Sequence, residues 1–307
     1  MGKAARAVRK GPQSEFVKKF EDLSGRYSIR QIWEDWVIMS AISISNSVDL
    51  EHAEARERDY LARAQKYSRD ELQVFSDLFV DFVKAMDVNP DQDFLGEMYM
   101  AVGMGNEHAG QFFTPYHLCK AMAKICAPDI PAGVERDHWI AVNDCACGAG
   151  ALLVAFANEC LSQNVNYQMS VLFTAQDIDY LVGCMCYLQL SILGCAGYVK
   201  IGDSLCDPLT SYDSRGLFPK DDGYIWYTPF FFSFVWDGRR RWALADQVFG
   251  KPKEPTTATE IQNQRLQRPI FEHADEQKVI TPPKPETPPE AAQAAFGEAK
   301  HGQLTFF

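Results

Sequence analysis

The chain has 307 residues, of which 47% are hydrophobic, and it carries a formal net charge of −11 at pH 7. This length and apolar content allow a sizeable core of one or two domains. The acidic balance excludes strong DNA binding without local help, because contacts to phosphates need clustered lysine and arginine. Two local clusters meet that need, namely an N-terminal arm with Lys3, Arg6, Arg9 and Lys10 and the run Arg239, Arg240 and Arg241.

Nine cysteines without a secretory signal predict a cytoplasmic location, since residues 1–13 are basic and lack an apolar stretch of signal-peptide length. We expect residues 1–13 to form a disordered basic arm. The pairs Cys145/Cys147 and Cys184/Cys186 do not show the CxxC or Cys/His spacing of zinc sites. Buried thiols and no bound metal are therefore expected.

Residues 14–105 are predicted to form a helical domain. Ile29, Ile32 and Trp36 recur at helical spacing opposite a charged face, and apolar residues continue this pattern through 61–86. A loop rich in glycine follows, and it separates the helical domain from a different pattern downstream.

Residues 106–250 are predicted to form an α/β domain, because short apolar segments alternate with apolar helices. Such alternation is typical of a parallel sheet with helices packed on it. The uncharged run 180–198 resembles a membrane span in length, but it contains Gln189 and Ser191 and lies between two strands, so a buried core helix is expected. The predicted strands are 139–142, 171–175, 199–201 and 224–227, and the predicted helices are 151–161 and 180–194.

A glycine turn, Asp-Cys-Ala-Cys-Gly-Ala-Gly-Ala at 144–151, joins the first predicted strand to a helix. In a doubly wound sheet this turn meets a ligand at the carboxyl end of the strand. Gly148 and Gly150 let the backbone approach a ligand closely, and the following helix offers free N–H groups. The turn alone is a weak signal, because many strand–helix joints are glycine-rich for steric reasons.

Two acidic residues follow the next strands. Asp177 closes the second strand, where a carboxylate can accept hydrogen bonds from ribose hydroxyls. A solvated charge or a helix cap is the alternative for a single aspartate. Asp203 closes the third strand and can accept from an adenine amino group.

Four segments occur in order between residues 93 and 230: Asp93-Phe-Leu-Gly-Glu-Met-Tyr99, Gly110-Gln-Phe-Phe-Thr-Pro115, the turn 144–151 and the strand 222–230. Together they resemble the N6-adenine DNA methyltransferases of type I restriction-modification systems, whose cofactor turn reads DPACGTGG. The resemblance implies a Rossmann-like S-adenosylmethionine-dependent methyltransferase sheet, truncated in this chain, with a helical N-terminal domain.

The same resemblance implies an S-adenosylmethionine site. Departures from the family turn are mild, although the methyl group of Ala151, in place of a glycine, can crowd a ligand. The implied cofactor-binding residues are Gln111, Phe112, Phe113, Thr114 and Pro115 as its wall, Asp144, Ala146, Gly148 and Gly150 at the methionine end, Asp177 at the ribose and Asp203 at the adenine.

The catalytic motif departs further from the family pattern, a strand ending in Asn-Pro-Pro-aromatic. Here Tyr227, Thr228, Pro229 and Phe230 stand in its place. Phe230 can stack on a flipped-out base, but a phenol on a rigid ring is a poor substitute for a carboxamide. Two alternatives stay open: a site-specific DNA adenine-N6 methyltransferase, and a catalytically inactive relative that binds DNA, a partner subunit or the sliding clamp. RNA or protein as acceptor is a further possibility.

Only residues 231–250 lie between this motif and a polar tail, whereas a complete sheet of this class needs further strands. We expect either a minimal core or a core that a specificity or other partner subunit completes. The aromatic run 230–236 is alternatively plain buried core.

Residues 251–307 are predicted to be a disordered tail, since the proline-rich segment 281–289 cannot build a core. Its end resembles the QLxLF-type peptides that dock onto the bacterial sliding clamp through apolar anchors. The alternative is that this apolar end packs on its own domain. The docking residues would be Gln303, Leu304, Phe306 and Phe307.

Overall fold

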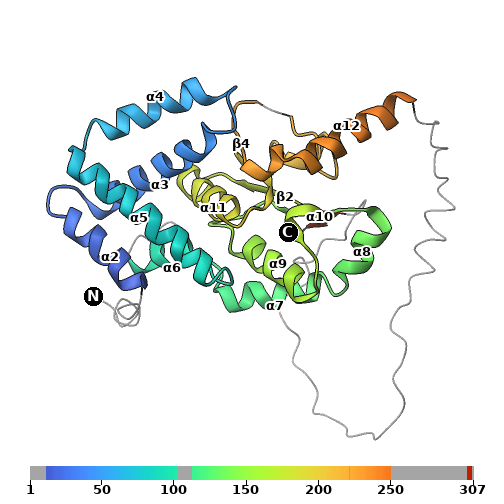
Figure 1. The fold of residues 1–307 in the computed structure, drawn as a ribbon, viewed down its shortest axis with the longest axis horizontal. Helices are drawn as coiled ribbons and strands as arrows, with labels where there is room; N and C mark the ends of the chain where they lie inside the picture. Colours follow the sequence, from blue (N-terminus) through green and yellow to red (C-terminus); the bar gives the residue numbers. More distant parts are fainter. Residues whose placement is uncertain (1–11, 103–112, 221, 250–302, 306–307) are drawn as a thin grey trace, which may run out of the picture. The chain divides into compact units, whose positions relative to one another are not determined.

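The computed structural model describes residues 12–102, 113–220, 222–249 and 303–305. Its first part is helical, as predicted, and these helices gather at one side of a sheet (Figure 1). Their bounds are α2 Pro12–Leu23, α3 Ile29–Ser45, α4 Ala53–Ala64, α5 Arg69–Val88 and α6 Phe94–Ala101.

Local signals in the sequence explain where two of these helices begin. The Ser28 hydroxyl accepts from the Gln31 backbone N–H and caps α3. Ser68 and Glu71 form a reciprocal capping box at the start of α5. Interlocking aromatic rings then hold the helices together, since Phe16, Trp33, Trp36, Phe82 and Phe94 are almost completely buried and several of these rings meet edge to face.

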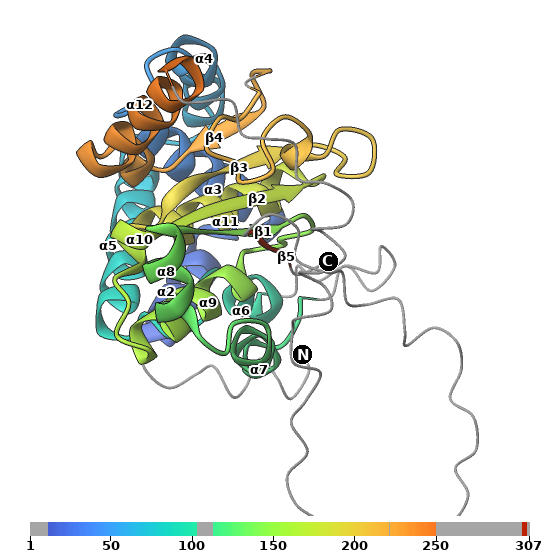
Figure 2. The same cartoon turned by 90° about the vertical axis from the view of Figure 1, so that its right-hand side faces the viewer.

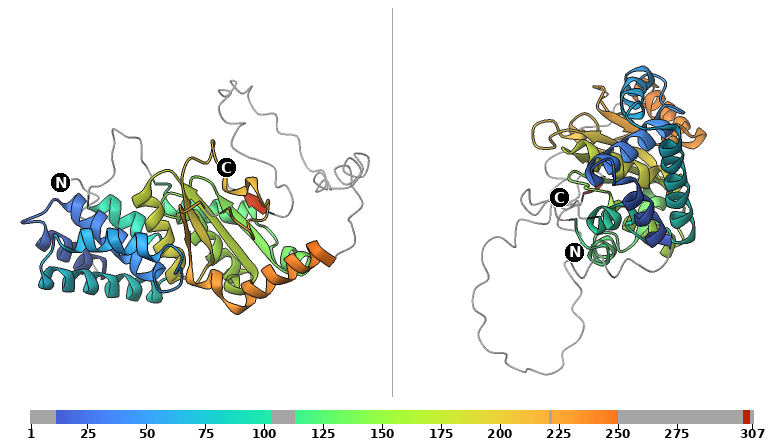
Figure 3. Two further views of the ribbon diagram at one scale, coloured as in Figure 1. Left: turned by 90° about the horizontal axis from the view of Figure 1, so that it is seen from above. Right: turned by 90° about the vertical axis from the view of Figure 1, so that its left-hand side faces the viewer.

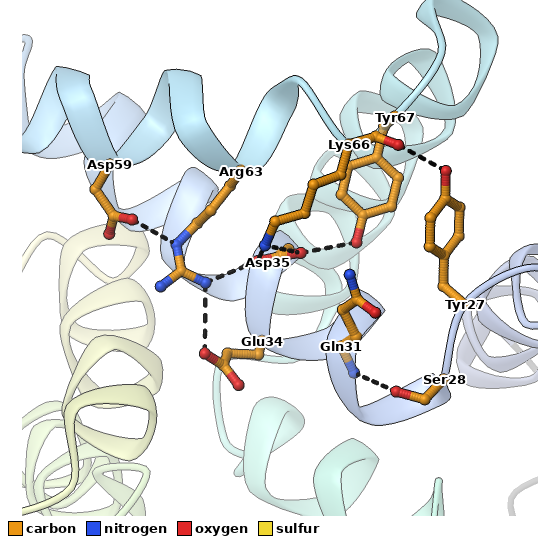
Figure 4. A network of polar contacts seen from close by, with 9 residues as sticks. All are labelled: Tyr27, Ser28, Gln31, Glu34, Asp35, Asp59, Arg63, Lys66 and Tyr67. Atoms are coloured by element: carbon orange, nitrogen blue, oxygen red, sulfur yellow. Dashed lines mark hydrogen bonds and ion pairs between the residues drawn. The ribbon is translucent and has the colours of Figure 1, made fainter.

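A buried carboxylate fastens α3 to the α4–α5 connection (Figure 4). Asp35 is 1% exposed and accepts from Arg63 at 2.7 Å, from Lys66 at 3.1 Å and from the Tyr67 hydroxyl at 2.9 Å. Arg63 also pairs with Asp59, so the network spans one turn of α4. Three donors satisfy the buried charge, so removing any one of them would leave the Asp35 carboxylate poorly compensated and destabilise the packing of these helices.

Within the described residues the sheet has five strands, in the order β4-β3-β2-β1-β5 (Figure 2). β1, β2 and β3 are parallel neighbours, and β5 adds to β1 in parallel. β4 pairs with β3 in the antiparallel direction, so the sheet is mixed, whereas the sequence predicts a parallel one. The bounds are β1 Ile140–Asp144, β2 Val171–Asp177, β3 Ala196–Ile201, β4 Ile225–Tyr227 and β5 Gln303–Thr305.

Two helices cover one face of the sheet. α9 (Ala151–Ser162) contacts β1, and α11 (Tyr180–Ile192) contacts β2 and β3 while α3 packs on its other side (Figure 3). Residues 181–190 of α11 are all buried, which confirms the predicted core helix. Among the described helices none is long and apolar enough to cross a membrane. The other helices are α7 Tyr116–Cys126, α8 Ile130–Asp137, α10 Tyr167–Ser170 and α12 Phe234–Phe249, with 3-10 turns at η1 Leu209–Ser211 and η2 Pro229–Phe232.

Arg56 of α4 links the N-terminal helices to the edge strand β4. Its buried guanidinium donates to Asp49 and to the backbone carbonyl of Ile225, each at 2.6 Å. It also lies over the Trp226 ring, 4.2 Å from the centroid. The edge strand is therefore held by a helix from the other end of the sequence.

The C-terminal peptide is paired with the sheet. The backbone of β5 pairs with β1, which corresponds to the alternative in which this peptide packs on its own domain. Phe306 and Phe307 lie outside the described residues.

The aromatic run 230–236 is only partly buried. Phe231 and Trp236 are buried, but Phe234 is 91% exposed. Plain buried core therefore describes only part of that run. The described residues up to 240 form one compact unit with β5, and residues 241–249 belong to a second.

Candidate functional site

A cavity of about 170 Å³ lies at the carboxyl end of β1, against the glycine turn. It is bounded by the turn, by the start of α6, by the loop before α7 and by α7 itself. The lining residues are Asp93, Phe113, Thr114, Cys119, Met122, Asp144, Ala146, Cys147, Gly148, Ala149, Ala151 and Leu152.

The turn takes its shape from two glycines in the left-handed region. Gly148 has φ +54° and Gly150 has φ +92°, a conformation that residues with a Cβ adopt at a cost. The backbone N–H of Cys147 donates to the Gln176 carbonyl at 3.0 Å, and the N–H of Gly148 donates to the Asp177 carboxylate at 2.8 Å. The end of β2 therefore holds the turn that follows β1.

Asp144 ends β1 and faces the cavity while 2% exposed. One of its carboxylate oxygens accepts from the Ala146 backbone N–H at 3.2 Å. Burial raises the pKa of Asp144 to about 7, and the nearby charge of Asp177 acts in the same direction. Such a carboxylate is strongly stabilised by any cation that enters the cavity.

Asp93 is a second buried carboxylate at the cavity, and the sequence assigned it no role in the site. It is the N-cap of α6, accepting from the Gly96 N–H at 3.0 Å, and it also accepts from the Gln189 side chain at 2.8 Å. Burial raises the pKa of Asp93. Its membership of a segment that resembles the methyltransferases was the only sequence signal that pointed to it.

The structure brings together about half of the predicted cofactor residues. Phe113, Thr114, Asp144, Ala146 and Gly148 all line the cavity. Four predicted residues do not line it, namely Pro115, Gly150, Asp177 and Asp203. Pro115 is the N-cap of α7, and Gly150 packs on Cys186. Gln111 and Phe112 lie outside the described residues.

Asp177 ends β2, and Asp203 follows the end of the neighbouring parallel strand β3. The Asp177 backbone carbonyl accepts from the Gly202 N–H at 2.9 Å, so the two aspartates follow adjoining points of the sheet. Asp177 is half-buried and already holds the turn, whereas Asp203 is exposed and accepts from the Leu205 N–H at 2.8 Å. The three predicted aspartates thus share one edge of the sheet, with Asp144 in the cavity.

The predicted catalytic residues lie at the opposite edge. β4 runs antiparallel to β3, with Ile225 opposite Lys200 and Tyr227 opposite Tyr198, so the chain moves away from the cofactor turn as it reaches Tyr227. Thr228 then donates to the Cys195 carbonyl at 2.7 Å, just before β3 begins. The quartet Tyr227, Thr228, Pro229 and Phe230 therefore lies away from the cavity, at the other edge of the sheet.

Structural contacts account for two residues of this quartet, Tyr227 and Thr228. The Tyr227 ring stacks on Phe231, with centroids 4.8 Å apart, and meets Tyr198 edge to face at 5.8 Å. The buried Thr228 hydroxyl also accepts from the Gly197 N–H at 3.0 Å. The sequence did not predict this arrangement, because the residues of a strand do not determine whether it runs parallel or antiparallel to its neighbour.

The four cysteines of the two pairs are reduced thiols in different settings. Cys147 lines the cavity and is hydrogen bonded to Cys186, an interaction that together with burial raises the pKa of the Cys147 thiol. Cys184 is buried and Cys145 is half-buried. Within the described part of the chain no group of three or more His, Cys, Asp or Glu residues is placed to hold a metal.

Comparison with known proteins gives the class of this domain. Residues 91–238 match the family described as N-6 DNA Methylase. Residues 91–238 are the methylase segment of the chain. A comparison with curated proteins gave no match. Among solved structures, the chain is similar to the type I restriction-modification methyltransferase subunit of Streptococcus thermophilus, with 16% identity and a TM-score of 0.34 over 48% of this chain and 31% of that subunit.

The methylase segment contains the whole cavity lining, since its residues run from Asp93 to Leu152. It also contains β1 to β4, so the mixed part of the sheet lies within it. The chain spans about a third of the length of the Streptococcus thermophilus subunit.

Proposed function

We propose that the methylase segment binds S-adenosylmethionine at the cavity beside the glycine turn and serves in methylation of adenine N6 in DNA. The observation that carries the proposal is the pair of buried carboxylates, Asp93 and Asp144, facing one small cavity beside that turn. A ligand that carries positive charge offsets the cost of burying them.

The cavity suits one end of such a cofactor. Its volume of about 170 Å³ is below the several hundred Å³ typical of sites that enclose a whole drug-sized ligand. We assign the methionine end to the cavity, with Phe113 and Thr114 as its wall. The nucleoside would extend along the strand ends, towards Asp177 at the ribose and Asp203 at the adenine.

When bound, the cofactor would supply an electrophilic methyl group on sulfur for transfer to the adenine amino nitrogen, which would leave the neutral thioether S-adenosylhomocysteine and a proton that passes to solvent. In this proposal the chain's own residues hold the donor and exclude water from it. The residues that hold the acceptor base would come from outside Tyr227–Phe230, because that quartet lies at the other edge of the sheet. A type I partner subunit is the candidate source.

A second candidate function is a methyltransferase-like protein without transfer activity, which binds DNA or a partner subunit. The direction of β4 favours it, since it removes the predicted catalytic side chains from the cofactor edge.

Two measurements separate these functions. Calorimetric titration with S-adenosylmethionine tests the cofactor site, with Asp144→Asn as the variant expected to bind at least ten times more weakly. Transfer of labelled methyl to DNA, alone and with a type I specificity subunit, tests the enzyme; a duplex of only G·C pairs is the acceptor-free control. Binding without transfer under both conditions supports the second function. Failure of the wild-type chain to bind the cofactor rejects the cofactor site.

A further inference from the structure

The cavity lining has an unusual charge content. Its charged side chains are Asp93 and Asp144, and no lysine, arginine or histidine is among the residues that line it. Asp93 is 3% exposed and Asp144 is 2% exposed. Two carboxylates buried at one small cavity are poorly solvated, so their ionised forms are costly unless a cation joins them.

Asp93 is held rigidly at this cavity. Its Oδ1 atom accepts both from the Gly96 N–H and from the Gln189 side chain. Gln189 also donates to the Ala149 carbonyl at 2.8 Å and accepts from the Leu95 N–H at 3.3 Å. One buried amide thus joins the Asp93 carboxylate directly to the glycine turn.

The other carboxylate oxygen lies tight against Gly96. A Cβ on Gly96 would be 2.1 Å from the Oδ2 atom of Asp93, so any side chain there would displace the carboxylate. Glycine in the first turn of a helix lowers helix propensity. The glycine at this point is therefore explained by the position of the carboxylate.

Helix capping alone does not explain a buried charge here. Serine and asparagine cap helices about as well as aspartate and carry no charge to bury. The capping bond uses only Oδ1, and the charge of Asp93 has no basic partner among the described contacts of its side chain. A cationic ligand group would give the aspartate a role that serine or asparagine cannot fill.

We infer that Asp93, together with Asp144, binds the α-ammonium group of the methionine end of the cofactor, and that Asp93 makes the site select ligands carrying that group. This inference rests on the proposed function, because it assigns a role within the same site. Asp93 acts as a specificity-determining residue, and Gln189 acts as a positioning residue that aligns it with the turn.

The test compares two ligands that differ only in the ammonium group: S-adenosylhomocysteine and its analogue with hydrogen in place of the α-amino group. Both lack the positive sulfonium, so the preference between them reports the ammonium alone. Wild-type protein is expected to prefer the amino-bearing ligand by roughly 10- to 100-fold, the range for a charge-assisted hydrogen bond.

Asp93→Asn is the main variant, because asparagine keeps the capping oxygen and the acceptor for Gln189. It is expected to abolish most of the preference while binding the deaminated analogue as wild type does. Asp93→Ser repeats the test with a different capping residue. Glu97→Gln is the matched control, since this exposed residue lies one turn along α6 and loses the same charge outside the cavity.

Gly96→Ala probes the geometry without changing charge, and it should weaken binding of the amino-bearing ligand by displacing the carboxylate. Thermal unfolding of each variant verifies folding. An unchanged ligand preference in folded Asp93→Asn and Asp93→Ser would overturn the inference and leave the cofactor site standing. A wild-type chain that binds neither S-adenosylmethionine nor S-adenosylhomocysteine would overturn both.

Discussion

The carboxylate of Asp177 accepts a hydrogen bond from the backbone N–H of Gly148 at 2.8 Å, so a side chain at the end of β2 fixes the turn after β1. Its other oxygen accepts from the Asp179 N–H at 3.0 Å. This one residue therefore organises the turn, the end of β2 and the start of α11. Asp177 therefore has a structural role in the site in addition to its proposed contact with a ribose.

Asp177→Ala is expected to lower the free energy of unfolding by about 1–3 kcal/mol, because it leaves the Gly148 N–H without its partner. Asp177→Asn keeps one of the two acceptor oxygens and should fall between alanine and wild type. Urea denaturation measures both. Ile178→Ala, at an exposed neighbouring residue, is the control and should unfold like wild type. Equal stability of Asp177→Ala and wild type would contradict the assignment.

Gly150→Ala is expected to destabilise the fold by about 2–4 kcal/mol, since alanine in the left-handed region and overpacking each cost a few kcal/mol at most. The added Cβ would meet the Cys186 sulfur at 2.8 Å. Cys186→Ala in the same chain should restore the part due to overlap. Gly202→Ala is the control, because a Cβ added there would lie no closer than 3.8 Å to another residue outside its chain neighbours. Equal free energies of unfolding for Gly150→Ala and Gly202→Ala, measured by chemical denaturation, would refute this account.

The stability of the chain should fall as pH rises from about 4 to 7. Asp144, with its pKa raised to about 7, keeps its proton in the folded state over a range where the unfolded chain has lost it. The loss is at most about 1.4 kcal/mol per pH unit for one such proton. Burial raises the pKa of Asp177 and Asp93 in the same direction.

Urea unfolding at pH 5, 6, 7 and 8 checks the sign. Asp144→Asn should flatten the decline, because asparagine does not titrate. A parallel decline in wild type and variant would show that Asp144 titrates normally in the folded chain.

Tyr227→Leu is expected to reduce stability by about 1–3 kcal/mol through lost packing on Phe231 and Tyr198. It should leave the dissociation constant for S-adenosylmethionine within twofold of wild type, because Tyr227 lies at the edge away from the turn. Tyr224→Leu is the control, since that ring is 62% exposed and should contribute little to stability. Weakened cofactor binding in a Tyr227 variant of normal stability would return this residue to the site.

Periodicity and motif order predicted a large part of the fold. The helical N-terminal part, α9, the buried α11 and strands β1 to β3 all occur close to their expected places. The turn 144–151 was predictable because glycines between a strand and a helix can adopt the left-handed conformation that a tight turn requires. These features depend on residues that are near one another in the chain.

The site was predicted less completely. Asp93 was missed because it lies 51 residues before Asp144 in the chain and reaches the cavity only through the packing of α6 on α11. The bond from Gln189 to Asp93 joins residues 96 positions apart. A sequence pattern shows the type of each residue but not which distant residue meets it.

The sequence by itself determined the helices, the central strands and the glycine turn, because hydrophobic period, capping residues and left-handed glycines act over a few neighbouring positions. Only the tertiary structure decided the direction of β4, the pairing of β5 with β1 and the meeting of Asp93 with Asp144 at one cavity. The physical reason is that strand pairing uses backbone groups that every residue carries, so the choice of neighbour depends on packing across the whole core.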